Sequence, residues 1–207
     1  MPSSEYIIHG TQTKNIIKIL KDGYIDNDPP KKDIVMLINK PAKQIFSQLI
    51  YKDIPNEKEQ KPNWGMCAII LDKKLLKDYP FYATGIGEFS DKFENGKTSE
   101  KTIISGDGNL PKMPSLTKLK TAIAKRMDWN MSIAFMHSHE ILFNKKIPLD
   151  TYCKCIICGP YLTPKEKKTI MELSNKLDIP VKFYEKNKQN EFIGLGINNL
   201  IDIIEKE

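Results

Sequence analysis

Short apolar segments of strand length alternate irregularly with amphipathic segments in the N-terminal part of the chain. The apolar segments predict strands at residues 6–8, 44–51 and 65–71. Isoleucine and leucine recur at helical spacing over residues 14–21, which predicts a helix that Thr11 or Thr13 caps. Gly23 follows this segment, and because glycine commonly ends a helix we expect the helix to stop there. A second, short helix is predicted after Asp72.

The C-terminal half shows the same mixture of patterns. Strands are predicted at residues 153–158 and 181–184, and helices at residues 115–127, 164–177 and 198–204. Residues 83–114 are rich in glycine and charge, which indicates a long irregular excursion with one strand at most. Short helices interrupt the strands irregularly, and regular strand–helix alternation is absent. We therefore expect one α+β domain over residues 1–207, with mostly antiparallel strand pairing.

The composition is that of an ordinary folded protein. The chain has 207 residues, of which 40% are apolar and 28% are charged, and this is enough to build a substantial core. It contains no apolar stretch of the length that crosses a membrane, and its first residues lack the pattern of a secretory signal. Four widely spread cysteines do not suggest a disulfide framework. We therefore expect an intracellular protein, cytoplasmic or nuclear, without a membrane partner.

The basic residues are almost all lysine. The formal net charge is +6, and Arg126 is the only arginine among 32 basic residues. Arginine is the side chain that clamps carboxylates and phosphates through two parallel hydrogen bonds, so mechanisms that need several such clamps are excluded. The positive charge is spread along the chain and favours contact with an anionic partner such as nucleic acid.

Two short motifs combine residue types that can carry chemistry. The first is His9-Gly10-Thr11, which ends a predicted strand just before a helix. Glycine there permits close approach of a ligand, and the histidine and the hydroxyl can bond ribose hydroxyls. The second is Glu140, which follows His137-Ser138-His139 and opens an apolar segment. A carboxylate beside apolar groups needs a partner or a task, and in a cleft its charge can stabilise a developing oxocarbenium ion.

Together these motifs resemble the ADP-ribosyltransferase superfamily. A His-Gly-Thr on the first strand, a following helix that ends Ile-Leu-Lys-x-Gly, and a late glutamate that opens a strand are similar to its His–Tyr–Glu branch. That branch includes the poly(ADP-ribose) polymerases and the diphtheria-type toxins. The segment after Glu140 also resembles the DNA ADP-ribosyltransferase toxins. The resemblance implies an α+β fold in which two small, split antiparallel sheets meet at a cleft, with helices on the flanks.

The resemblance further implies NAD as the substrate and a role for each residue of the two motifs. His9 would bind the adenosine ribose, and Gly10 would bind the nicotinamide amide through its backbone, with Thr11 beside them in the cofactor site. Glu140 would be the catalytic carboxylate. No metal takes part in this reaction, and ADP-ribose would pass to a macromolecular acceptor, either protein or nucleic acid.

The remaining positions of the family pattern match less closely. The stacking tyrosine of the family falls after the second strand, where Tyr51 is the first candidate and Tyr82 the reserve. Ser138 stands where some toxin families carry the Gln or Glu that selects the acceptor, so the acceptor stays open. The single Arg126 lies far from the second strand, where the DNA-modifying toxins carry an arginine, and this argues against thymidine modification.

A different interpretation of the same region is a zinc hydrolase. His137, His139 and Asp150 match the ligand spacing of the JAMM-type zinc isopeptidases. In that family two histidines and a carboxylate hold zinc and leave a position for activated water. An upstream glutamate would be the general base: Glu88, Glu94 or Glu100. Ile147 occupies the position of the required serine, and Glu140 that of a proline, so the pattern is incomplete.

A third interpretation keeps the fold without the chemistry. The chain would then be a degenerate ADP-ribosyltransferase-like module that binds an ADP-ribose-like ligand, a nucleic acid or a protein. His9 and Glu140 would be present, but nicotinamide would not be released from NAD⁺.

The cysteines predict no metal site. Cys153 and Cys155 would share one face of a strand and Cys158 the opposite face, while Cys67 is distant in the chain. Because such thiols cannot converge on one metal ion, we expect them to be small buried residues in a reducing compartment.

Overall fold

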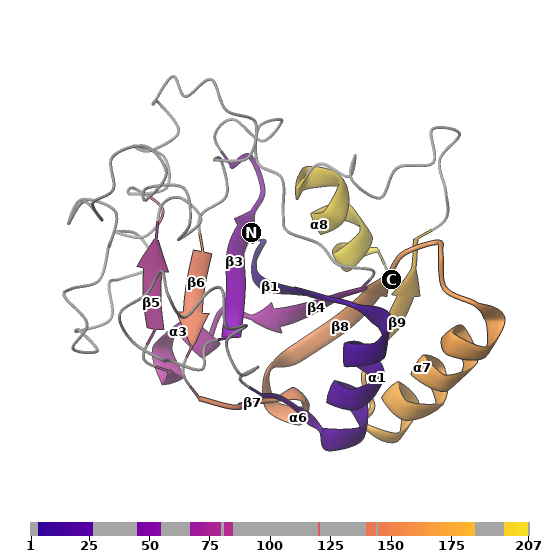
Figure 1. Ribbon diagram of the computed structural model, residues 1–207. Helices are drawn as coiled ribbons and strands as arrows, with labels where there is room; N and C mark the ends of the chain where they lie inside the picture. The colour runs from indigo at the N-terminus through magenta and orange to yellow at the C-terminus, as the bar shows by residue number, and fades with distance from the viewer. Residues whose placement is uncertain are drawn as a thin grey trace, which may run out of the picture.

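The computed structural model describes residues 4–26, 45–54, 67–79, 81–84, 120, 140–143, 145–184 and 197–206 (Figure 1). The elements in chain order are β1 (Glu5–Thr11), α1 (Thr13–Asp22), β2 (Tyr24–Ile25), β3 (Ile45–Tyr51), β4 (Cys67–Asp72), α3 (Leu75–Asp78), β5 (Phe81–Thr84), β6 (Glu140–Phe143), β7 (Ile147–Pro148), α6 (Leu149–Tyr152), β8 (Cys153–Cys158), α7 (Pro164–Lys176), β9 (Val181–Phe183) and α8 (Ile197–Glu205). No helix within these ranges is long and apolar enough to cross a membrane.

Seven strands form one sheet in the order β5-β6-β3-β1-β4-β8-β9, and β2 pairs with β7 in a small second sheet. Neighbouring strands of the large sheet are antiparallel, except that β8 and β9 are parallel. A parallel pair needs a crossover connection, and α7 provides it. The fold is therefore α+β with a mostly antiparallel sheet and flanking helices, as the sequence predicts.

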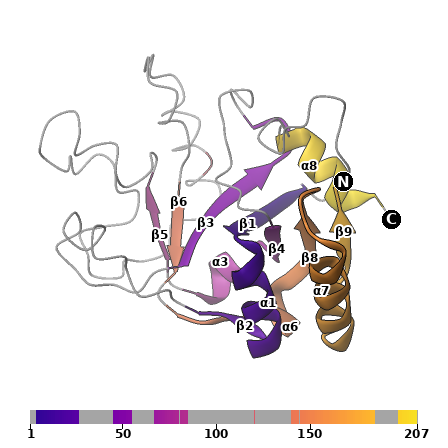
Figure 2. The same ribbon diagram turned by 45° about the vertical axis from the view of Figure 1, so that its right-hand side comes forward.

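Helices cover both faces of the large sheet. The Nζ atom of Lys167 in α7 lies 5.5 Å from the ring centroid of Phe183 in β9. The adjacent residue, Lys182, donates hydrogen bonds of 2.9 Å to the carbonyl groups of Ile203 and Ile204 in α8. Neighbouring residues of a strand point to opposite faces, so α7 and α8 lie on opposite faces. α1 packs beside α7, as both views show (Figure 2).

β3 belongs to two different ladders. Its residues 45–47 pair with β6, and its residues 48–51 pair with β1. β5, β6 and β3 stand side by side in Figure 1, at an angle to β1 and β4. The large sheet therefore consists of two parts that are joined through β3, one antiparallel throughout and the other antiparallel except for β8 and β9.

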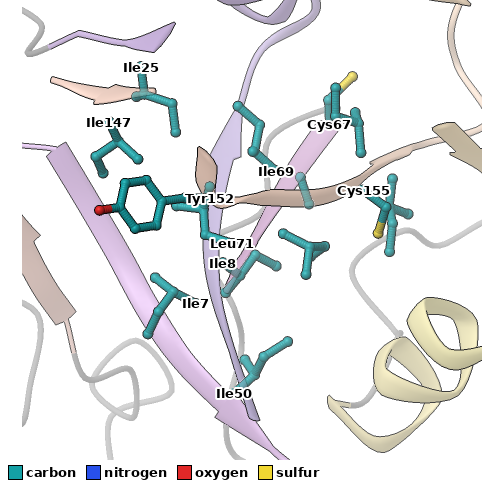
Figure 3. Close-up of a cluster of buried hydrophobic side chains, with 14 of the residues drawn as sticks. Ile7, Ile8, Ile25, Ile50, Cys67, Ile69, Leu71, Ile147, Tyr152 and Cys155 are labelled. Atoms are coloured by element: carbon teal, nitrogen blue, oxygen red, sulfur yellow. The ribbon is translucent and has the colours of Figure 1, made fainter. Parts of the chain in front are cut away.

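Isoleucine is the most frequent buried apolar residue in the described part of the chain, and many of these isoleucines lie in the central strands. Residues 67–71 of β4 are buried without interruption, as expected for a strand covered on both faces. Figure 3 shows Ile7 and Ile8 of β1 in one cluster with Ile69 and Leu71 of β4. β-branched side chains suit such strands because they pack well on a pleated surface.

The ends of α1 and α7 show how local sequence sets the boundaries of these helices. Gly23 adopts φ 76°, a left-handed conformation that glycine tolerates, and its N–H donates to the carbonyl of Ile19. The N-cap of α1 is Gln12, without a side-chain capping bond, so the expectation of a Thr11 or Thr13 cap is wrong. Thr11 instead belongs to β1. α7 begins with a full capping box, in which Thr163 and Glu166 satisfy each other's backbone N–H groups.

Several predicted elements differ from the structure. β5 was not predicted, and its last residues, 83–84, were assigned to the irregular excursion. The rest of that excursion lies outside the described residues. So does the helix predicted over residues 115–127, apart from Lys120, which is helical. The two-residue strands β2 and β7 were also missed, because segments so short carry no periodic signal.

Candidate functional site

The His9-Gly10-Thr11 motif lies where the two parts of the sheet separate. These residues form the C-terminal end of β1 and pair with residues 67–69 of β4. On the other side of β1, the ladder with β3 ends at the pair of Ile8 and Gln48. The chain then continues through Gln12 directly into α1. The motif therefore follows immediately on the point where β1 and β3 stop pairing.

Glu140 lies at the same level of the sheet, on the other side of β3. It is the first residue of β6 and pairs with Thr84 of β5. The next residue, Ile141, pairs with Ser47, which precedes the Gln48 of the β1 ladder. β6 and β1 are two positions apart in the strand order, with β3 between them. The structure thus brings the two motifs to the same junction, although it describes only the backbone of Glu140.

Buried polar side chains gather at this junction. Thr11 and Gln48 are buried, and Ser47 is only 3% exposed. The Oγ atom of Ser47 has no hydrogen-bond partner in the part of the chain that the structure describes. A buried hydroxyl without a partner is costly, so packing within the described residues does not by itself account for Ser47.

Ser47 and Gln48 are not among the site residues that the sequence predicts. A signal was present, because the two polar residues interrupt an apolar strand between Ile45 and Leu49. Strict alternation would place only every second residue of a half-buried strand in a polar environment. Two successive polar residues in a strand that is buried on both faces therefore depart from the pattern expected of a core strand.

Tyr51, the first candidate for the stacking tyrosine, is not brought to His9. It pairs with Glu5 at the opposite end of β1, about 14 Å along the strand from His9 at ~3.4 Å per residue. Its ring is buried beneath Lys120, with Nζ 4.6 Å from the centroid. Burial, and then the nearby Glu5 carboxylate, raise the pKa of Tyr51. These contacts describe a core residue beside the buried Glu5 carboxylate, which forms ion pairs with Lys73 and Lys120.

Tyr82, the reserve candidate, lies closer to the junction. It belongs to β5 and pairs with Leu142 of β6. The pair of Thr84 and Glu140 is two residues away on the same ladder. Tyr82 is therefore near Glu140, whereas Tyr51 is near the start of β1.

The structure describes only part of the alternative zinc site. His137 and His139 lie outside the described residues, as do the three candidate general bases, Glu88, Glu94 and Glu100. Asp150 is exposed on α6, and one of its carboxylate oxygens accepts a hydrogen bond of 2.9 Å from the Thr151 hydroxyl. Within the residues that are described, no three His, Cys, Asp or Glu side chains are grouped to hold a metal ion.

The four cysteines are mostly core residues. Cys67, Cys155 and Cys158 are buried and Cys153 is partly buried, and all four are free thiols. Cys67 is distant from the others in the chain, but it pairs with Cys158 across β4 and β8, with the two Sγ atoms 3.3 Å apart. The sequence does not predict this pair, because the spacing of cysteines along the chain does not determine the register of β4 and β8.

We expect the thiols to destabilise the fold at alkaline pH. Burial raises the pKa of Cys155 to about 11 and raises that of Cys153 further, whereas an unfolded thiol titrates near pH 8.5. Because the folded pKa is the higher one, the contribution of the neutral thiols is complete below about pH 8.5 and is lost as the pH rises towards the folded value. Urea unfolding at pH 8 and pH 10 measures this loss, and Cys155→Ala should make it smaller. An equal loss in the variant would contradict the assignment.

No protein-family model matches the chain. A search of curated proteins likewise finds no significant match. The candidate site therefore rests on the chemistry and the register of its own residues.

Proposed function

We propose that the protein is an NAD-dependent ADP-ribosyltransferase. It cleaves the bond between nicotinamide and ribose in NAD⁺, releases nicotinamide, and transfers ADP-ribose to a nucleophile on a protein or nucleic acid, which loses a proton. The observation that carries the proposal is the position of His9-Gly10-Thr11 and Glu140 on the two sides of β3, where β3 changes its pairing partner. Only β3 lies between the strands that carry them.

The division of the sheet supports the finer fold assignment. Two antiparallel parts that meet at an angle are what the resemblance to ADP-ribosyltransferases implies. In this chain β3 joins two parts that meet at an angle, antiparallel except for β8 and β9, and helices flank them. Beyond the last pair of the β1–β3 ladder, the Gly10 backbone would bind the nicotinamide amide, which needs both a donor and an acceptor.

In this mechanism each residue has a defined task. His9 holds the adenosine ribose, and the backbone of Gly10 holds the nicotinamide amide, so the scissile bond is fixed in position. The carboxylate of Glu140 orients the ribose 2′-hydroxyl and stabilises the positive charge that develops on the ribose as nicotinamide leaves. Tyr82 rather than Tyr51 is the better candidate to stack on nicotinamide, because it lies two residues along the ladder from Glu140.

The test is release of nicotinamide from NAD⁺ by the purified protein, together with the equilibrium binding of NAD⁺ by calorimetry. The proposal predicts both binding and release, and transfer of labelled ADP-ribose when cell protein and nucleic acid are added. Binding without release over hours would instead identify the degenerate module. Stoichiometric zinc that is lost on replacing His137 and His139 would favour the hydrolase and overturn the proposal.

A further inference from the structure

Two neighbouring helices present lysine stripes to solvent. On α1, the exposed residues Lys14, Lys18 and Lys21 follow one another at spacings of four and three residues. On α7, the exposed residues are Lys165, Lys168 and Lys176, at spacings of three and eight. Each set lies on one side of its helix, because a helix repeats every 3.6 residues. We call these six residues the α1–α7 lysine face.

The lysine face points away from the sheet on both helices. α1 buries Ile16 and Leu20, and α7 buries Ile170 and Ser174, on the sides opposite the lysines. The two helices lie side by side in both views (Figures 1 and 2). Packed helix axes are about 8–10 Å apart. The two stripes therefore form one surface.

Acidic side chains compensate only part of this charge. Asp22 forms an ion pair of 2.9 Å with Lys18, and Glu172 forms a loose pair of 3.9 Å with Lys168. Glu166 is occupied in the cap at the start of α7. The four other lysines of the face have no ion pair in the described part of the chain. A large share of the net charge of +6 is thus concentrated on two helices.

We propose that the α1–α7 lysine face binds the phosphate backbone of nucleic acid. Its stripes extend for about 10 Å on α1 and about 16 Å on α7, at 1.5 Å per residue. Phosphates of one DNA strand recur about every 3.4 Å along the duplex axis, so each stripe spans several of them. Lysine is a compact point charge that suits phosphate contact without base recognition. This inference does not depend on turnover of NAD⁺.

The chemistry of the face favours nucleic acid over other anionic partners. Protein interfaces are enriched in aromatic residues and depleted in lysine. On α7 the one large apolar side chain with high exposure among the described residues is Met171, at 47%. A membrane surface would need a broad apolar face to insert into the lipid, and here the apolar sides of both helices are buried against the sheet.

The test is binding of a fluorescent, random-sequence 20-base-pair DNA duplex, followed by anisotropy from 50 to 200 mM NaCl. The full chain should bind in the range of about 10⁻⁴–10⁻⁶ M, with affinity falling steeply with salt. The variant with Lys14, Lys21, Lys165 and Lys176 all replaced by Gln should bind at least about 10-fold more weakly and depend less on salt.

A matched control separates the face from the net charge. Replacing the exposed Lys52, Lys74, Lys77 and Lys206 by Gln removes the same charge from other parts of the surface, and should change the affinity less than about 3-fold. Circular dichroism verifies that both variants are folded. Equal weakening by the two variants would overturn the proposal, and so would absence of salt-dependent binding by the unmodified chain. Displacement of the duplex by polyglutamate at equal charge would overturn it in favour of an acidic protein partner.

Discussion

Replacement of Glu140 by glutamine is expected to lower the rate of nicotinamide release by about 10²–10³-fold. The amide has nearly the shape of the carboxylate but carries no charge, so it cannot stabilise the positive ribose of the transition state. We expect kcat to fall and the dissociation constant of NAD⁺ to change little, because the lost interaction strengthens only as the bond breaks. Initial-rate assays of nicotinamide release, with NAD⁺ binding measured separately, give both quantities.

The control for this experiment is Glu172→Gln. Glu172 lies exposed on α7, forms a loose pair with Lys168, and does not belong to the junction around β3. The same chemical change there should leave turnover unaffected. If Glu140→Gln retains full activity in a folded protein, Glu140 is not the catalytic carboxylate.

The largest effect on stability is expected for Phe143→Ala, which should lower the free energy of unfolding by about 3–5 kcal/mol. Phe143 is completely buried in β6, where it pairs with Ile45 of β3 and Phe81 of β5. The rings of Phe143 and Phe81 lie 6.1 Å apart between centroids. Truncation removes these contacts and leaves a cavity that the short strands on either side can fill only in part. Urea unfolding followed by circular dichroism measures the change.

Phe143→Leu separates packing from other causes, because it keeps an apolar side chain of similar length and should cost much less than the alanine variant. Phe143 also packs β6 against its neighbours, and Glu140 is the first residue of this strand. We therefore expect Phe143→Ala to reduce nicotinamide release under conditions in which the protein is still folded. A loss of stability below about 1 kcal/mol would show that β6 is not packed as described.

The central strands and the longer helices could be predicted from sequence, because each carries a strong local signal. β4 is a continuous apolar segment, α1 has apolar residues at helical spacing before Gly23, and α7 begins with a capping box. β5, β2 and β7 could not be predicted in this way. They are short, and they are strands because other strands lie beside them, which is information from distant parts of the chain.

The candidate site could likewise be predicted from the sequence only in part. The residue types of His9-Gly10-Thr11 and Glu140 suggest their chemistry, but only the ladders of β3 place them at one junction. The sequence ranks Tyr51 before Tyr82, because Tyr51 ends an apolar segment of strand length. Register separates them, since Tyr51 pairs with Glu5 at the far end of β1. The unpartnered hydroxyl of Ser47 likewise emerges only from the packing around it.

The double membership of β3 also determines where the chain can tolerate changes in length. Side chains of a strand alternate between faces, so one added residue reverses the orientation of all those that follow it. An insertion between Ser47 and Gln48 could preserve the pairing of β3 with β6 or its pairing with β1. It would shift the register of one ladder relative to the other. β3 therefore acts as a common reference that keeps both halves of the sheet aligned. Evolution can lengthen the connections on either side of it, while the strand itself must keep its length.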